Sequence, residues 1–400
     1  MDLKKKLARL KTHSAKTDGP AGTVLRLIGE ARVTPHGEVH AVTQSFAPSH
    51  VQGGALLSRA ISATGSLVAK LALDPRLEAI DFSRALFIDT ETTGLSHGAG
   101  TIPFLIGMAW YDGTAVQVEQ LVLRKPGEER PMLGVLAERI ASASCIVSYN
   151  GKSFDWPLLR TRYILNRMRE PQPTAHVDLL HCARRVYRRR LACVQLTELE
   201  REVLDLHRKG DVGGAEIPTI YMDFLRGKDG ACLTPILTHN MHDLVSLVAL
   251  LGVLVDKLEA ASSDDDVRDQ LALAELSVRA GDGDRAHAFA GAAIAGSLPH
   301  ESADVSAPAL ALLAGMHKRR GEYASAAHAL ERALTYADHE SAPHLHLELA
   351  KLYERHLRDH ERALTHARAS TVAESEPANT KRIKRLTVSA AKLMLPLDLD

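Results

Sequence analysis

Residues 86–95, LFIDTETTGL, constrain the fold more than any other stretch of this 400-residue chain. A continuous apolar run that ends in acids is typical of a central strand, buried on both faces. Residues two apart on a strand point to the same side, so Asp89 and Glu91 are expected on one face at the strand's carboxyl end. Two anions on one face repel each other unless protons or a cation neutralise them. All-oxygen ligation suits Mg²⁺ or Mn²⁺, although a strand that ends in solvent often carries acids without a metal.

The region from residue 81 to about 260 alternates between strand and helix patterns, which predicts an α/β domain with a mixed sheet. Its first three strands are expected to form an antiparallel meander, because Asp112-Gly113 between the second and third is a strong hairpin signal. Thr234-Pro235 resembles the start of a helix, with a capping residue followed by a first-turn proline. The expected strands are 84–91, 101–111, 114–124 and 145–150, and the expected helices are 128–142, 156–168 and 234–258.

The two flanking regions differ from this domain in composition. Residues 1–80 mix a basic start, a Gly/His/Ser-rich middle and a helical stretch, and we assign this region no chemistry. Residues 259–269 are acidic and Ser-rich and read as a linker. Residues 265–395 are Ala- and Leu-rich and helical in period, with small residues at equivalent places in three segments, 40 and then 37 residues apart (Ala286, Ala326, Ala363). This pattern resembles the tetratricopeptide repeat, with a plain helical bundle as the alternative.

Bulk composition excludes some classes of protein. The chain is 45% apolar and 24% charged with a net charge of zero, so it is an ordinary globular sequence in which only local clusters can favour a polyanionic partner. No apolar run reaches the roughly 18 residues that a transmembrane helix needs, and the basic N-terminus lacks the apolar segment of a secretory signal. The four cysteines show no CxxC pair, which favours isolated thiols over two disulfides. We therefore predict a cytoplasmic protein with no membrane association.

Two further acids stand at positions that suit a shared site. Asp155 follows a strand and the pair Asn150-Gly151, at the start of a helix, where an acid also favours the helix dipole. Asp243 interrupts the apolar helix LTHNMHDLVSLVALL, with His239 one turn earlier on the same face. Taken singly, each has an ordinary structural explanation, as a helix-start acid or as part of a solvated helix face.

Taken together, IDTETTGL, YNGKSFD and HNMHD resemble the three motifs of the ribonuclease-H-like DEDD 3′–5′ exonuclease superfamily. The resemblance covers roughly residues 84–256, and the C-terminal helical repeats are similar to a bacterial branch of that superfamily with tetratricopeptide repeats. It implies a ribonuclease-H-like α/β domain over 81–260, with a mixed sheet and flanking helices, followed by the all-α repeat domain. The metal carboxylates that it implies are Asp89, Glu91, Asp155 and Asp243.

One position departs from the common pattern of that superfamily. The superfamily has a Tyr four residues, or a His five residues, before the last Asp, whereas here His239 stands four residues before Asp243. We predict His239 as the general base over a purely structural role, since imidazole titrates near neutral pH. His242 points roughly 100° away around the helix and is the poorer candidate. Asn150 and Asp178 are expected beside the site, where Asn150 orients a loop and Asp178 caps a helix or lies near the acids.

A local excess of positive charge lies between residues 150 and 190, where ten Lys or Arg stand against three acids. Backbone neutralisation and aromatic stacking are what single-stranded nucleic acids require. A charge run is also commonly a solvated face, and both interpretations stay open here. The residues expected to contact nucleic acid are Arg160, Arg184, Arg185, Arg188 and the aromatic Tyr187.

The resemblance implies hydrolysis of single-stranded DNA or RNA from the 3′ end, with two divalent cations, Mg²⁺ or Mn²⁺, about 3.5–4 Å apart. The repeats imply a protein partner or self-association. Two alternatives stay open: a nuclease fold without activity that serves as an interaction scaffold, and an endonuclease that uses the same metal chemistry. The sugar preference cannot be derived from any residue of the sequence.

Overall fold

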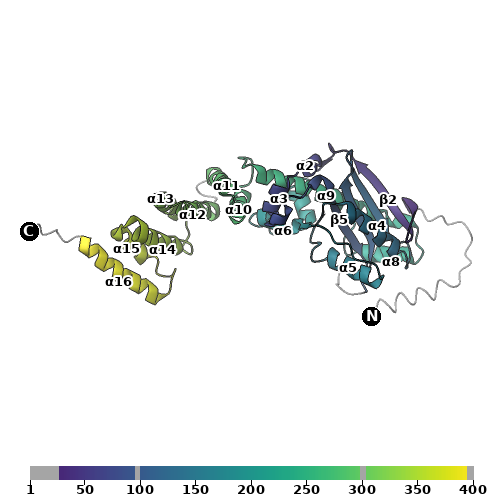
Figure 1. The fold of residues 1–400 in the computed structure, drawn as a ribbon. Coiled ribbons are helices and arrows are strands. Elements are labelled where there is room, and N and C mark those ends of the chain that lie inside the picture. Colours follow the sequence, from purple (N-terminus) through teal and green to yellow (C-terminus); the bar gives the residue numbers. More distant parts are fainter. Residues whose placement is uncertain (1–26, 95–99, 298–302, 394–400) are drawn as a thin grey trace, which may run out of the picture. The chain divides into compact units, whose positions relative to one another are not determined.

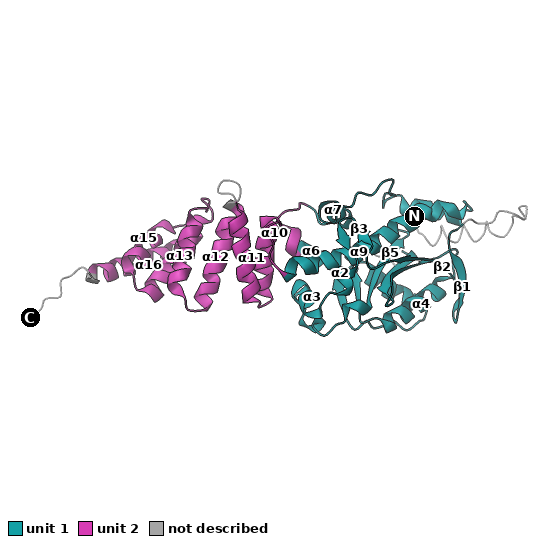
Figure 2. Cartoon of the chain, turned by 90° about the horizontal axis from the view of Figure 1, so that it is seen from above, with its two compact units in different colours: residues 1–184, 193–259 teal, residues 185–192, 260–400 magenta. Residues whose placement is uncertain are grey.

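The computed structural model describes residues 27–94, 100–297 and 303–393, and these residues form two compact units. Unit 1 contains residues up to 184 together with 193–259, and unit 2 contains 185–192 together with the chain from 260 onward. Figure 2 shows the two units in different colours. The short segment 185–192 therefore belongs with helices that follow it by more than 70 residues in the sequence.

Unit 1 is built on a seven-stranded mixed sheet in the order β1-β2-β7-β6-β5-β8-β9. The predicted meander is confirmed: β5, β6 and β7 pair antiparallel, whereas β8 pairs parallel to β5, and β9 parallel to β8. The strands are β1 (Glu30–Thr34), β2 (Gly37–Phe46), β5 (Ala85–Thr92), β6 (Pro103–Tyr111), β7 (Val116–Val122), β8 (Cys145–Ser148) and β9 (His176–Asp178).

Helices pack against this sheet, and the long α9 (Thr234–Glu259) contacts β5, β6 and β7 (Figure 1). A continuous apolar core joins the strands to the helices, as the continuous apolar pattern of β5 and β6 predicts. The other helices of unit 1 are α2 (Ser58–Ile61), α3 (Gly65–Ala72), α4 (Glu129–Ser142), α5 (Asp155–Leu165), α6 (Leu179–Tyr187, which continues into unit 2), α7 (Leu196–Glu202) and α8 (Ile217–Leu225).

The boundary predicted near residue 81 is not a structural boundary. Strand β2 pairs with β7 from His40 to Phe46, and helices α2 and α3 pack against α9. Without β2, strand β7 would present a row of unpaired backbone groups at the edge of the sheet. Residues 27–80 are thus part of the same unit as the α/β domain.

Unit 2 is all-helical over the described residues after 260, as predicted. Its helices pack as sequential neighbours, α10 with α11, α12 with α13 and α14 with α15. Ala286, Ala326 and Ala363, the small residues at equivalent places, are each fully buried. The helices are α10 (Val267–Arg279), α11 (Gly283–Gly296), α12 (Ala303–Arg319), α13 (Tyr323–Leu334), α14 (Ala342–Leu352), α15 (His360–Ala369) and α16 (Glu376–Leu393).

All four cysteines are free thiols, as expected from their spacing. Among the helices of the described residues, none combines the length and apolar character that spanning a membrane requires.

Candidate metal centre

The carboxyl end of β5 presents Asp89 and Glu91 beside helix α9. Asp89 is paired in register with Gly107 of β6, and the side chain of Asn240 lies directly over that glycine. Asn240 donates from Nδ2 to Asp89 Oδ2 at 2.7 Å, and its own Oδ1 accepts from Gln120 Nε2 at 2.9 Å. The Asn240 amide of α9 therefore contacts Asp89 of β5, 151 positions earlier in the sequence, and is itself held in place by Gln120 of β7.

Asp155 reaches the same site from the first residue of α5. Its carboxylate accepts a short hydrogen bond from Thr90 Oγ1, between Asp89 and Glu91 on β5. The loop before α5 is tightly built: Asn150 has a left-handed φ of 60°, and a Cβ on Gly151 would lie 2.3 Å from Ser148 Oγ. Asp178 secures this loop, because its carboxylate accepts the backbone N–H groups of Asn150 and Lys152 at 2.8 and 3.2 Å.

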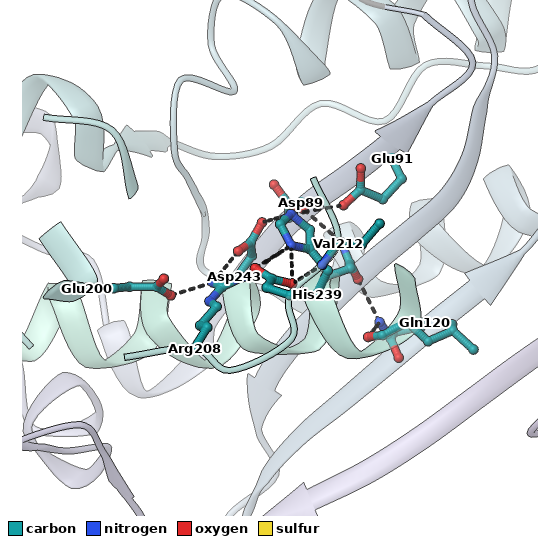
Figure 3. A network of polar contacts seen from close by, with 11 residues as sticks. Asp89, Glu91, Gln120, Glu200, Arg208, Val212, His239 and Asp243 are labelled. Carbon is teal, nitrogen blue, oxygen red and sulfur yellow. Dashed lines mark hydrogen bonds and ion pairs between the residues drawn. The ribbon is translucent and has the colours of Figure 1, made fainter. Parts of the chain in front are cut away.

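Helix α9 contributes His239 and Asp243 from one face, four residues apart. His239 Nε2 lies 3.5 Å from Asp243 Oδ2 and 4.0 Å from Glu91 Oε1 (Figure 3). One ligand atom from each of Glu91, His239 and Asp243 lies within 4.8 Å of the other two, so this triad could hold a metal ion.

The carboxylates of this cluster repel one another. Burial, together with the charges of Asp243, Glu91 and Asp155, raises the pKa of Asp89 well above its ordinary value. Burial and the neighbouring acids raise the pKa of Glu91 to about 8. Burial raises the pKa of Asp155 to about 6, although the hydrogen bond from Thr90 acts in the opposite direction. The cluster thus holds acids that need either protons or a cation to remain together at neutral pH.

Arg208 provides one such cation and was not predicted from the sequence. Its side chain is only 7% exposed and forms ion pairs with Glu200, Asp211 and Asp243 (Figure 3 shows Arg208 between Glu200 and Asp243). Asp211 in turn contacts His239 Nδ1 at 2.8 Å. Both residues lie in the segment between α7 and α8, in HRKGDVGG, where mixed charges and glycines are typical of an exposed loop and carry no signal of a site.

The comparisons with known proteins agree with this geometry. Residues 86–255 match the family model described as the RNase_H superfamily. This segment is an RNase H superfamily domain. Over 166 residues the chain is 40% identical to the uncharacterized protein YprB of Bacillus subtilis (strain 168), a stretch that makes up 41% of this chain and 40% of that protein. The chain therefore spans well under half the length of that relative.

The donor set of the RNase H domain fits a divalent cation. Carboxylate oxygens are the ligands that Mg²⁺ or Mn²⁺ prefers, and the raised pKa values of Asp89 and Glu91 indicate acids whose burial and mutual repulsion Arg208 does not offset. Arg208 is ion-paired with Asp243, and no ion pair joins it to Asp89 or Glu91 among the contacts of the described residues. By their geometry, Glu91, His239 and Asp243 are the described residues that could hold a metal ion together.

The other predicted residues of the RNase H domain lie in varied settings. Asp178 also accepts the N–H of Leu180 at 3.1 Å and so caps α6 as well as fixing the loop at Asn150. His242 is half-buried, and burial together with the charge of Arg208 lowers the pKa of its side chain. Arg160 is half-exposed and forms an ion pair with Glu170 at 2.8 Å. Arg184 and Arg188 are exposed, and Arg185 is partly buried.

The stacking role expected of Tyr187 is wrong. Its ring is fully buried, so it offers no face to a base. The neighbouring arginines are also engaged within unit 2, since Arg190 pairs with Asp269 at 3.1 Å and Arg189 with Glu275 at 2.6 Å. The sequence pattern does not distinguish this aromatic residue from a surface one, because α6 carries a strongly polar face beside the apolar face that it buries.

Proposed function

We propose that the RNase H domain is a metal-dependent 3′–5′ exonuclease that hydrolyses phosphodiester bonds in single-stranded DNA or RNA. The observation that carries this proposal is the convergence of Asp89, Glu91, Asp155 and Asp243 from one strand and two helices, with His239 at the edge of the cluster. The polarity of cleavage rests on the resemblance of the three motifs to DEDD exonucleases.

In this proposal the four carboxylates hold two divalent cations, Mg²⁺ or Mn²⁺. Bound there, the cations would supply Lewis acidity that favours deprotonation of the attacking water and stabilises charge on the leaving 3′ oxygen. Glu91, whose pKa of about 8 keeps it largely protonated at neutral pH, would give up its proton to a bound cation's charge, because opposite charge lowers the pKa of a carboxyl group. His239 accepts the proton of the water at Nε2, the nitrogen that faces Glu91 and Asp243.

The phosphate backbone needs cationic contacts outside the metal site. Arg184 and Arg188 are exposed and remain our candidates, together with Arg185 and with Arg160 in competition with Glu170. These contacts carry no sequence information, so we expect cleavage of many sequences and strong weakening by salt.

The test uses 5′-labelled single-stranded DNA and RNA of one sequence with Mg²⁺ or Mn²⁺. The proposal predicts a ladder that shortens from the 3′ end and that EDTA or Asp89→Asn abolishes. Asp256→Asn is the matched control, because Asp256 is on the same helix α9 but pairs with Arg59 outside the site. A circular oligonucleotide separates the two activities, since an exonuclease leaves it intact and an endonuclease linearises it.

A binding measurement accompanies the activity assay. Mn²⁺ should raise the melting temperature of the wild type and of Asp256→Asn, and it should raise that of Asp89→Asn much less. Folded wild-type protein that binds Mn²⁺ but leaves every substrate intact would contradict the exonuclease and favour the scaffold alternative. For unit 2 we propose tetratricopeptide-like repeats that bind a protein partner or a second copy of the chain, and for the protein a cytoplasmic location.

A further inference from the structure

The segment between α7 and α8 brings a second acid to His239. His239 Nδ1 lies 2.8 Å from Asp211 Oδ1 and 3.0 Å from Asp211 Oδ2. Arg208 Nη1 lies 3.1 Å from Asp211 Oδ2 and so holds the far oxygen of the same carboxylate. The side chains of His239 and Asp211 are 14% and 23% exposed, which limits competition from water for this contact.

The contact with Asp211 decides which nitrogen of His239 carries the proton. Arg208 donates to the same carboxylate, whose oxygens can only accept, so a contact of 2.8 Å between Asp211 Oδ1 and His239 Nδ1 requires the proton on Nδ1. Arg208 Nη1 is also 3.3 Å from Nδ1 and could donate to it in the other tautomer, but that tautomer would set two acceptors, Nδ1 and Asp211 Oδ1, against each other at only 2.8 Å.

With the proton on Nδ1, the lone pair of His239 is on Nε2. This nitrogen faces Asp243 Oδ2 at 3.5 Å and Glu91 Oε1 at 4.0 Å, which is the side of the ring where a water between the metal carboxylates would lie. The opposite tautomer would direct an N–H at these carboxylates and leave no acceptor for the proton of a water. Orientation and tautomer thus depend on one carboxylate outside the predicted set.

We propose that Asp211 is a positioning residue that holds His239 in the Nδ1–H tautomer, with Nε2 directed at the metal carboxylates to accept a proton during hydrolysis. This inference rests on the proposed function of the site. In the step, an O–H bond of water breaks, its proton moves to Nε2, and its oxygen bonds to phosphorus. The P–O3′ bond breaks with its electron pair on O3′, which takes a proton from solvent. The Asp211 carboxylate stays ionised and stabilises the imidazolium that forms.

Asp211→Asn is an informative variant because Arg208 fixes how the new amide lies. Arg208 Nη1 donates to Oδ2 at 3.1 Å and the backbone N–H of Val212 donates to Oδ1 at 3.0 Å, so these two donors compete for the single amide oxygen of the variant. The charged donor forms the stronger hydrogen bond, which keeps the oxygen at the position of Oδ2, gives up the bond to Val212 and turns the amide NH₂ toward Nδ1 of His239. That NH₂ donates to Nδ1 and forces the proton onto Nε2. Shape and volume are conserved while the tautomer is reversed.

The same segment provides a matched control. Asp205 also lies beside a histidine, with His207 Nε2 at 3.6 Å, but its side chain is 90% exposed, and the side chain of His207 is itself 65% exposed. Asp205 has a left-handed φ of 52°, which asparagine tolerates as well as aspartate does. Asp205→Asn therefore changes one charge in the same segment and leaves His239 unaffected.

The experiment combines kinetics with a spectroscopic measurement on the full chain. For Asp211→Asn we expect kcat to fall about 100-fold to 10,000-fold with little change in KM, and no change for Asp205→Asn. In a His239→Ala background, Asp211→Asn should cause no further loss, because it acts through His239. The nitrogen NMR signals of ¹⁵N-histidine-labelled protein, with His239 assigned by its absence in the alanine variant, should show protonation moving from Nδ1 to Nε2 in Asp211→Asn.

The outcomes separate this inference from the proposed function. A wild type that cleaves, with Asp211→Asn equally active or still in the Nδ1–H tautomer, overturns the positioning role and leaves the exonuclease standing. A fall in Mn²⁺ affinity or melting temperature that accounts for the lost activity assigns Asp211 to the stability of the segment and also overturns it. A wild type without activity overturns the exonuclease, while the NMR measurement still decides whether Asp211 sets the tautomer.

Discussion

At the scale of single residues, the acids of the candidate metal centre are held together against their own repulsion. Burial and the neighbouring acids raise the pKa of Glu91 to about 8, and burial raises the pKa of Asp155 to about 6. When folding raises the pKa of an acid, that acid contributes most to stability at pH values below the pKa that it has in the unfolded chain. That stability is lost as pH rises through the folded pKa, so the metal-free site should destabilise the fold more at neutral pH than at about pH 5, and most above about pH 8.

Glu91→Gln tests this stability relation. Glu91 has its ordinary pKa of 4.5 in the unfolded chain and a pKa of about 8 in the folded protein. The wild type in EDTA should therefore lose stability as the pH rises from 4.5 to about 8. Glutamine does not titrate, and the variant should therefore match the wild type at about pH 5 and exceed it at about pH 9 by a few kcal/mol. Urea unfolding at both pH values measures the difference.

Divalent cations should make the wild type more stable than Glu91→Gln at high pH. With saturating Mn²⁺ the wild type gains the free energy of binding, whereas Glu91→Gln has lost one ligand. Asp256→Asn, on α9 but outside the cluster, should behave as the wild type does in both media. Equal stability of wild type and Glu91→Gln at high pH in EDTA would mean that the ionised side chain of Glu91 does not destabilise the fold.

The acids of the site are predictable from the sequence, but the residues that hold them are not. Asp89 and Glu91 can be found because two carboxylates at the end of an apolar strand need an explanation within the strand itself. Asn240 is adjacent to His239 in HNMHD, yet a neutral amide inside a helix carries no charge to explain and so gives no signal. Arg208 and Asp211 depend on the path of a loop, and loop path is set by tertiary contacts that no local pattern encodes.

At the scale of elements, the strand and helix patterns were sufficient for β5 to β8, α4, α5 and α9, whose apolar periodicity is strong. They failed for β1 and β2, which lie in a region of mixed glycine, histidine and serine. Of the ten residues of β2, only Val39, Ala41 and Val42 are buried apolar side chains, because one end of the strand extends beyond the core. A strand at the edge of the core has too short an apolar pattern to be recognised alone.

The packing of α9 on the sheet depends on Gly107. A Cβ at this position would lie 2.2 Å from Asn240 Oδ1 and 2.8 Å from Leu244 Cδ1, so Gly107→Ala must push the helix or the amide away. We expect a loss of stability of about 1–3 kcal/mol. Because Asn240 would leave Asp89, we also expect metal affinity to fall about 10-fold to 100-fold. Urea unfolding and Mn²⁺ titration measure the two effects.

Gly291→Ala is the control for this substitution. Gly291 is inside helix α11 and has no positive φ, and a Cβ added there would meet no atom within 4 Å. Alanine is the better helix former by up to about 1 kcal/mol, so this change should be neutral or slightly stabilising and should leave the metal site unaltered. Unchanged Mn²⁺ affinity in a folded Gly107→Ala protein would argue that Asn240 does not orient Asp89.

At the scale of the whole molecule, the two units are not simply consecutive along the chain. Residues 185–192 belong to unit 2 although they lie within the sequence of the RNase H domain. Within unit 2, Arg190 pairs with Asp269 of α10, and the carboxylate of Asp269 is 1% exposed. Arg189 makes a second pair with Glu275 of the same helix, but both side chains are about two fifths exposed, at 39% and 41%.

These two ion pairs predict different energetic effects for a similar truncation. Asp269→Ala removes a buried partner and leaves the Arg190 side chain, 19% exposed, without its main counter-charge, which should cost about 3 kcal/mol. Glu275→Ala removes an exposed partner and should cost about 1 kcal/mol or less. Hydrogen exchange should become faster in residues 185–192 and in α10 for Asp269→Ala, and it should stay at the wild-type rate for Glu275→Ala. If both variants left exchange in 185–192 unchanged, this segment would be held by its buried apolar side chains, Val186, Tyr187 and Leu191, and the ion pair would contribute nothing to joining it to unit 2.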